Sequence, residues 1–313
     1  MRTLVVGAGG IGGYFGGRML QAGRDVTFLV RPRRAQQLAT RGLIIKSQKG
    51  GDYHHPNPPA VQAGAVAGPY DLILLSCKAF DLEDAIASFA PAVGPNTAIL
   101  PMLNGMLHMD ALRARFGDAA VLGGLCFIAA TLSTEGEVQH LNPNQGMVFG
   151  EPDKSRSARI TAIEAEMAAC SFDSRLSLDI TQDMWEKWVF IGTGAGLTCL
   201  LRASVGDIEA AGGAALADAL LAECAAIATE SGFPPSQSSI EHGHKTFTAP
   251  GSTLTASMYR DLTQGGRTEC EHVLGDLLRR GKREHSVNSI LRMAYTSVAA
   301  YEVGRARAAA AKG

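Results

Sequence analysis

A glycine-rich segment near the N-terminus constrains the fold more than any other feature of this 313-residue chain. The short apolar run Thr3–Val6 reads as a strand, and an expected helix runs from about Ile11 to Ala22. Gly23 is placed to end that helix. Strand, glycine loop and helix in this order are typical of the first unit of a doubly wound sheet that binds a dinucleotide. The loop itself matches the pattern G-x-G-x-x-G in the run Gly7-Ala8-Gly9-Gly10-Ile11-Gly12.

The glycines of this loop have separate expected roles. Gly7 permits the tight turn, Gly9 lets the backbone approach a pyrophosphate, and Gly12 lets the helix pack closely on the strand. The amino end of the helix offers N–H groups and the positive end of its dipole to phosphates. A glycine-rich turn that serves packing alone is the alternative interpretation. We predict that all six residues, including Ala8, Gly10 and Ile11, belong to a dinucleotide site.

The second expected strand, Asp25–Val30, indicates which dinucleotide binds. NAD-binding proteins usually end this strand with Asp or Glu, whose carboxylate binds the ribose 2′-OH. Here Arg31 follows instead, and Pro32 starts a helix that carries Arg33 and Arg34. Guanidinium groups pair with a 2′-phosphate that a carboxylate would repel. The sequence therefore predicts NADPH/NADP as the cofactor, with Arg31 as the first ligand and Arg33 or Arg34 as support.

The rest of the chain predicts two domains. Strands alternate with helices at first, and antiparallel strands with turn signals follow between Leu125 and Phe149. Helices dominate from Thr181 onward, and Arg305–Gly313 reads as a fraying tail. The predicted fold is α/β, a Rossmann-type doubly wound sheet with appended antiparallel strands (1–180), followed by an all-α C-terminal domain (181–313). The strands expected beyond the second are Leu72–Ser76, Ala98–Leu100, Cys126–Leu132, Val138–Leu141, Met147–Phe149 after a turn at Asn142–Gly146, and Ser174–Leu178.

Charge and composition exclude several classes of partner. A formal net charge of −1 argues against a nucleic acid or an anionic membrane surface, since both need a basic surplus. The apolar stretch Gly212–Thr229 is interrupted by Asp218 and Glu223, as in a soluble helix. We expect no signal peptide ahead of the first strand, and the six scattered cysteines form no C-x-x-C pair. We expect a cytoplasmic protein with reduced, mostly buried thiols and no metal site.

Several ordered segments occur together along the chain: Gly7 to Gly12, Arg31, Cys77-Lys78-Ala79, Leu103-Asn104-Gly105-Met106, Trp185-Glu186-Lys187-Trp188, Ser257-Met258 and Glu269. With these segments the chain resembles the ketopantoate reductase (2-dehydropantoate 2-reductase) family, within the 6-phosphogluconate-dehydrogenase-like superfamily. The resemblance implies an NADP-dependent oxidoreductase that reduces ketopantoate to pantoate in pantothenate biosynthesis. Helical domains of this kind often form homodimers, which is an argument from fold analogy.

The resemblance implies catalytic roles for Lys187, Asn104 and Glu269. Hydride addition to a ketone places negative charge on its oxygen, so a nearby ammonium group stabilises that charge and donates a proton. Lys187 has this role by resemblance, and the alternative is a surface lysine paired with Asp183. Asn104 can accept from the lysine and donate to substrate or ribose, and the alternative is an ordinary Asn-Gly turn.

Three further residues complete the implied site. Lys78 contacts the cofactor near the nicotinamide by resemblance, and the alternative is a surface lysine beside a helix. Ser257 and Glu269 bind the polar groups and the carboxylate of the substrate by the same argument, with an exposed helical glutamate as the alternative for Glu269. Glu223, within an apolar helix, is a weaker candidate for a buried partner of the lysine.

One departure from the family concerns the substrate. Members typically carry asparagines one and two helical turns beyond the catalytic lysine, where this chain has Ile191 and Ala195. These positions share a helix face with Lys187, so the wall beside it becomes apolar. We therefore hypothesise a bulkier or less polar 2-keto acid or ketone. The rival functions are a non-catalytic NADP(H) sensor and a hydroxy-acid or imine dehydrogenase of the same superfamily.

Overall fold

The computed structural model describes residues 1–311 and divides into two compact units. The first unit consists of residues 1–103 and 108–181, and the second of residues 104–107 and the chain from residue 182 onward. The short segment Asn104–Leu107 thus packs with the helical unit, although it follows the last strand of the first sheet in the chain. Its place in the second unit was not predicted from the sequence.

A five-stranded parallel sheet forms the centre of the first unit. The order β5-β2-β1-β6-β7 has the first strand in the middle, as in a doubly wound fold, and the predicted fold class is confirmed. All four residues of β6 and of β7 are buried, which explains their apolar sequences. The elements are β1 (Arg2–Val6), α1 (Gly10–Gln21), β2 (Asp25–Leu29), α2 (Pro32–Arg41), β5 (Ala60–Val61), β6 (Leu72–Leu75), α3 (Leu82–Phe89), β7 (Ala98–Pro101) and α4 (Leu107–Phe116).

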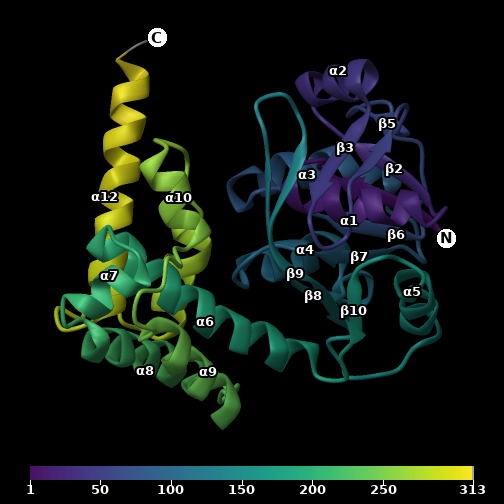
Figure 1. Cartoon of the computed structure of the whole chain (residues 1–313). Helices are drawn as coiled ribbons and strands as arrows, with labels where there is room; N and C mark the ends of the chain where they lie inside the picture. Colours follow the sequence, from purple (N-terminus) through teal and green to yellow (C-terminus); the bar gives the residue numbers. More distant parts are fainter. Residues whose placement is uncertain (312–313) are drawn as a thin grey trace. The chain divides into compact units, whose positions relative to one another are not determined.

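The expected antiparallel strands are present, but they belong to a second sheet instead of extending the first. Its order is β10-β9-β3-β4, and β8 pairs antiparallel with β9. Figure 1 shows β8 and β9 as a long pair of strands. The elements are β3 (Leu43–Ser47), β4 (Tyr53–His55), β8 (Gly123–Leu132), β9 (Val138–Gly150), α5 (Ala158–Ala168) and β10 (Asp173–Leu176).

The turn expected at Asn142–Gly146 is wrong, because β9 continues through it. Ile128 pairs with Gln145 and Ala130 with His140, so residues 141–144 face Ala129 alone. The backbone N–H of Ala129 donates to the side-chain oxygen of Asn142 at 2.9 Å. The turn-forming residues therefore make a bulge within a strand instead of ending it.

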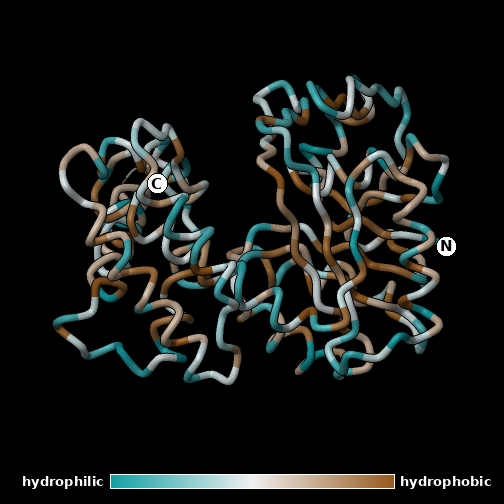
Figure 2. Tube along the Cα trace, turned by 60° about the horizontal axis from the view of Figure 1, so that its bottom comes forward, coloured by the Kyte–Doolittle hydropathy of each residue, from teal (hydrophilic) through white to brown (hydrophobic). Residues whose placement is uncertain are grey.

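Helix α1 packs against both sheets and joins their cores. Its buried side chains Tyr14, Phe15 and Met19 share one hydrophobic cluster with residues of β2, β3 and β9. A Cβ at Gly16 would lie 2.7 Å from the ring of Phe28, and one at Gly17 would lie 2.6 Å from the Ile45 side chain. The glycines of α1 thus allow close packing on both sides. Figure 2 shows hydrophobic residues (brown) concentrated in the strands and hydrophilic ones (teal) in the outer loops.

The second unit is helical, as predicted, and its longest helices are α6 and α12 (Figure 1). The tail expected to fray from Arg305 is helical as far as Ala310, and residues 312–313 lie outside the described part. Within residues 1–311, no helix combines the length and apolarity needed to cross a membrane. The helices are α6 (Ile180–Leu201), α7 (Val205–Ala210), α8 (Ala214–Glu230), α9 (Gln237–Phe247), α10 (Ser257–Thr263), a π-helical turn (Glu271–Gly275), α11 (Asp276–Arg280) and α12 (Ile290–Ala310).

Three glycines in α6 let neighbouring helices approach it. A Cβ at Gly192 would lie 3.1 Å from Leu277, one at Gly194 would lie 2.9 Å from Phe247, and one at Gly196 would lie 3.0 Å from Leu220. Each glycine weakens a helix by about 1 kcal/mol relative to alanine. The packing of α8, α9 and α11 on α6 offsets this cost, and it explains the glycine-rich sequence.

Candidate active site

The second unit brings Lys187 and Asn104 together. Lys187 lies on the second turn of α6, beside the buried side chains of Trp185 and Trp188, and is itself half-buried. Its Nζ donates a hydrogen bond to Oδ1 of Asn104 at 3.1 Å. The side-chain oxygen of Asn104 therefore orients the ammonium group of Lys187. The NH₂ group of the same amide is a hydrogen-bond donor.

The Asn-Gly pair is fixed by the π-helical turn. Gly105 has a φ of +78°, and a Cβ at this position would collide with the backbone oxygen of His272. The indole Nε1 of Trp188 donates to the backbone oxygen of Val273 at 2.9 Å. Glycine is thus required after Asn104 for two reasons, backbone conformation and close approach. The π-helical turn holds the asparagine near α6 through these contacts.

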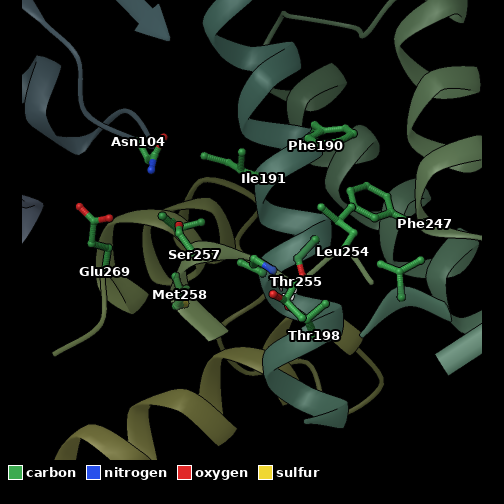
Figure 3. Close-up of a pocket in the computed structure, with 15 residues that line it drawn as sticks. Asn104, Phe190, Ile191, Thr198, Phe247, Leu254, Thr255, Ser257, Met258 and Glu269 are labelled. Atoms are coloured by element: carbon green, nitrogen blue, oxygen red, sulfur yellow. Dashed lines mark hydrogen bonds between the residues drawn. The ribbon is translucent and has the colours of Figure 1, made fainter. Parts of the chain in front are cut away.

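A cavity of about 110 Å³ lies next to Asn104 within the same unit. Asn104, Glu269 and Ser257 lie toward one side of it, and Phe190 and Phe247 lie toward the other (Figure 3). The predicted residues Asn104, Ser257 and Glu269 therefore meet at one site. The full lining is Asn104, Phe190, Ile191, Gly194, Ala195, Thr198, Val205, Phe247, Leu254, Thr255, Ala256, Ser257, Met258, Glu269 and Val273.

Burial lowers the pKa of His272, whose ring lies near this site, and the charge of Glu269 acts in the opposite direction. The imidazole is therefore mostly neutral at neutral pH. His272 contributes its backbone oxygen to the fit of Gly105 and adds little positive charge to the site.

The glycine loop of the first unit has the geometry of a phosphate-binding turn. Gly7 has a φ of +94°, and a Cβ at Gly12 would collide with the backbone oxygen of Gly7 and the hydroxyl of Ser76. A Cβ at Gly9 would meet no atom within 4 Å, and no side chain caps the amino end of α1 there. Open space and backbone donors at a helix start fit the pyrophosphate of a dinucleotide. Gly10 differs, since its Cβ would lie 2.5 Å from the backbone oxygen of Ala130 and it serves packing on β8.

The arginines after β2 have different roles. Arg31 is exposed and forms an ion pair with Asp81 at 3.0 Å, which raises the pKa of Arg31 through the hydrogen bond and the charge. Arg34 is buried, and it donates to the backbone oxygens of Ala8 at 2.8 Å and Gly136 at 2.7 Å. Burial lowers the pKa of Arg34 to about 10. Arg34 thus positions the glycine loop through its contact with Ala8.

Comparison with known proteins identifies the family. The model "Ketopantoate reductase PanE/ApbA" matches residues 3–154, and its C-terminal counterpart matches residues 179–302. The chain belongs to the ketopantoate reductase family. An uncharacterized oxidoreductase, YkpB of Bacillus subtilis, is 37% identical over 303 residues, covering 96% of this chain and 99% of that protein.

Solved structures agree with this family assignment. The structure of 2-dehydropantoate 2-reductase from Geobacter metallireducens has a TM-score of 0.87 at 28% identity and covers 96% of this chain and 99% of that chain. A ternary structure of D-mandelate dehydrogenase with NADH and anilino(oxo)acetate has a TM-score of 0.85 at 21% identity, with 97% and 99% covered. The second likeness concerns the fold alone. The chain is thus an oxidoreductase-family protein of the ketopantoate reductase type.

The structure also places two other residues that the sequence analysis considered for the site, Lys78 and Glu223. Lys78 is exposed in the first unit, directly before a short 3₁₀ segment that begins at Ala79. Glu223 is not a partner of Lys187, because its carboxylate accepts from the hydroxyl of Ser289 and from the backbone N–H of Leu291 at 3.1 Å. Glu223 therefore caps the amino end of α12.

The cysteines of this family member are all free thiols, and four of the six are buried. Burial raises the pKa of Cys199, Cys224 and Cys270 to about 12 and that of Cys170 to about 11. Thiols with such pKa values are poor nucleophiles at neutral pH. Within residues 1–311, no group of three or more His, Cys, Asp or Glu side chains is arranged to hold a metal ion.

Several residues of the site were not found from the sequence. Phe190, Phe247 and Leu254 line the cavity, but apolar residues on helices and loops are usually core and give no separate signal. The contact between Gly105 and His272 joins residues far apart in the chain. A glycine after the asparagine was visible in the sequence, whereas the backbone it approaches was not.

Proposed function

We propose that the chain is an NADPH-dependent reductase of a 2-keto acid or related ketone, with Lys187 as the proton donor. The substrate class includes ketopantoate and less polar analogues. The observation that supports this most directly is the hydrogen bond between Lys187 and Asn104 beside a mostly apolar cavity that Asn104 lines. Membership of the ketopantoate reductase family supports the reaction class.

The residues of the second unit act on the carbonyl group in this proposal. When bound, the reduced nucleotide supplies a hydride to the carbonyl carbon. Lys187 donates a hydrogen bond to the carbonyl oxygen, stabilises its developing charge and transfers a proton to it. Asn104 holds the ammonium group in place, and Glu269 and Ser257 bind polar groups of the substrate. The surrounding apolar walls exclude water and strengthen these interactions.

The first unit holds the nucleotide in this proposal. Residues Gly7 to Gly12 and the amino end of α1 bind the pyrophosphate, Arg31 binds the 2′-phosphate and Lys78 contacts the nicotinamide side. The ion pair between Arg31 and Asp81 is solvent-exposed, and such pairs contribute about 0.2–1 kcal/mol. A hydrogen bond to a charged group contributes about 1.5–3 kcal/mol, so a 2′-phosphate can displace Asp81.

Replacing Arg31 with alanine is expected to weaken NADPH binding about 10- to 100-fold, in line with the loss of one charged phosphate contact. The affinity for NADH should change less than about threefold, because NADH carries no 2′-phosphate. Fluorescence titration of both reduced nucleotides measures these dissociation constants. Equal losses for both nucleotides would contradict the assigned ligand.

Asp81→Asn is the matched change on the other side of the ion pair. It removes the competing carboxylate and is expected to strengthen NADPH binding about two- to fivefold, the size of an exposed pair. Weaker NADPH binding in this variant would indicate that Asp81 positions Arg31 instead of competing for it.

Oxidation of NADPH by the purified chain in the presence of 2-keto acids tests the proposed function. Turnover with any of them excludes a non-catalytic nucleotide sensor. Nucleotide binding without turnover of any ketone or keto acid would overturn the proposal and favour the sensor.

A further inference from the structure

We infer that the cavity of the second unit receives a branched hydrocarbon substituent of the carbonyl compound, such as the isobutyl group of 4-methyl-2-oxopentanoate. The inference rests on the proposed function, and it names the substrate class for that site. It predicts that this protein prefers such acids over the hydroxylated substrate after which its family is named.

The first argument concerns the polarity of the side chains that line the cavity. Among the described residues that line the cavity, Glu269 has the only charged side chain, and it is an anion. None of these lining side chains carries a positive charge, so an uncharged substituent of the keto acid suits most of the lining better than its carboxylate does. Asn104 and Ser257, which lie toward one side in Figure 3, can donate hydrogen bonds to the carbonyl and the carboxylate, so we expect these groups to stay on that side.

The part of the lining formed by Phe190, Phe247 and Thr198 is apolar in effect, because the hydroxyl of this threonine is already hydrogen-bonded. The hydroxyl of Thr198 donates to the backbone oxygen of Gly194 at 2.7 Å and accepts from the N–H of Ala256 at 3.4 Å. The rings of Phe190 and Phe247 pack with their centroids 4.8 Å apart. A hydroxyl group on the substrate would lose its hydration beside Thr198 and the two rings without gaining a matching hydrogen bond there.

The volume of the cavity sets the size of the substituent. An apolar cavity of about 150 Å³ in another protein binds benzene. At about 110 Å³, this cavity suits a branched group of about four carbons. Ile191 and Ala195 form the wall on α6, and the small Gly194 between them allows Phe247 to close that side.

A panel of keto acids with one shared headgroup tests the inference. The reductase activity of the wild type is measured with pyruvate, 4-methyl-2-oxopentanoate and ketopantoate, and kcat/KM is compared. Each buried methylene strengthens binding about fourfold, so three more carbons should raise kcat/KM about 60-fold over pyruvate. Ketopantoate should be a poorer substrate than 4-methyl-2-oxopentanoate. Equal or better kcat/KM for ketopantoate would overturn the inference and leave the proposed function standing.

Variants of the α6 wall link this preference to the cavity. Ile191→Asn should lower kcat/KM for 4-methyl-2-oxopentanoate about tenfold or more and leave that for pyruvate within about threefold. Leu201→Asn, an exposed position on the same helix, is the matched control and should change neither. Ala195→Leu is a second variant of the same wall. Its larger side chain fills the cavity and should remove the preference for the branched acid. A uniform loss for all acids in both wall variants would contradict the inference.

Measuring the binding of the keto acids distinguishes failure of the inference from failure of the proposed function. If no acid is turned over, the proposed function fails, and calorimetry with the NADP-loaded protein still compares the affinities of 4-methyl-2-oxopentanoate and ketopantoate. Tighter binding of the branched acid that is lost in Ile191→Asn supports the cavity assignment. Equal binding of the two acids overturns it.

Discussion

Replacing Lys187 with alanine is expected to lower kcat about 1,000-fold, within the range of about 10²–10⁴ that a positioned proton donor contributes. In the wild type, a 3.1 Å hydrogen bond to Asn104 holds the lysine. The substitution removes the ammonium group that we propose stabilises the charge on the carbonyl oxygen. The affinity for NADPH should stay within about threefold, because the assigned nucleotide ligands lie in the other unit. Steady-state kinetics and fluorescence titration measure the two quantities.

Lys245→Ala is the matched control for this substitution. Lys245 is an exposed lysine on α9 in the same unit and does not line the cavity. It should leave kcat unchanged. A Lys187→Ala enzyme that retains more than about a tenth of kcat would show that another group donates the proton.

Replacing Gly105 with alanine is the second change with a large expected effect. Alanine at a φ of +78° costs about 1–2 kcal/mol, and its Cβ would in addition collide with the backbone oxygen of His272. The segment must then shift and carry Asn104 away from Lys187. A displacement of about 1 Å in a positioning group can lower kcat about 100-fold.

Gly265→Ala distinguishes backbone strain from this displacement. Gly265 has a φ of +73° in the same unit, but a Cβ there would meet no atom within 4 Å. Both variants should therefore melt at a lower temperature than the wild type, and only Gly105→Ala should lose kcat. Similar kcat values in the two variants would mean that the contact with His272 does not position the asparagine.

The first half of the fold could be predicted from sequence because its signals are local. Gly23 ends α1 with a φ of +72°, and Pro32 starts α2 at the first helical position, as expected. Asn142–Gly146 misled the prediction, since turn-forming residues also suit a bulge when a partner strand supplies the register. Whether such residues turn the chain depends on a strand elsewhere in the sequence.

The candidate site could be predicted only where a motif carried its residues. Asn104, Ser257 and Glu269 were assigned by resemblance, and the structure brings them to one cavity. The sequence shows the charge of Arg34 but not its burial, so its contacts with the glycine loop could not be predicted. The cavity itself depends on Phe247 packing against Gly194, a contact between helices that no local pattern encodes.

The central claim is that this chain reduces a keto acid with NADPH, and the absorbance of NADPH followed during incubation with 2-keto acids tests it most directly. The account predicts steady NADPH consumption that depends on both the enzyme and the acid, and that is about 1,000-fold slower in Lys187→Ala. A wild-type protein that binds NADPH yet consumes none with ketopantoate, pyruvate or 4-methyl-2-oxopentanoate would contradict the account.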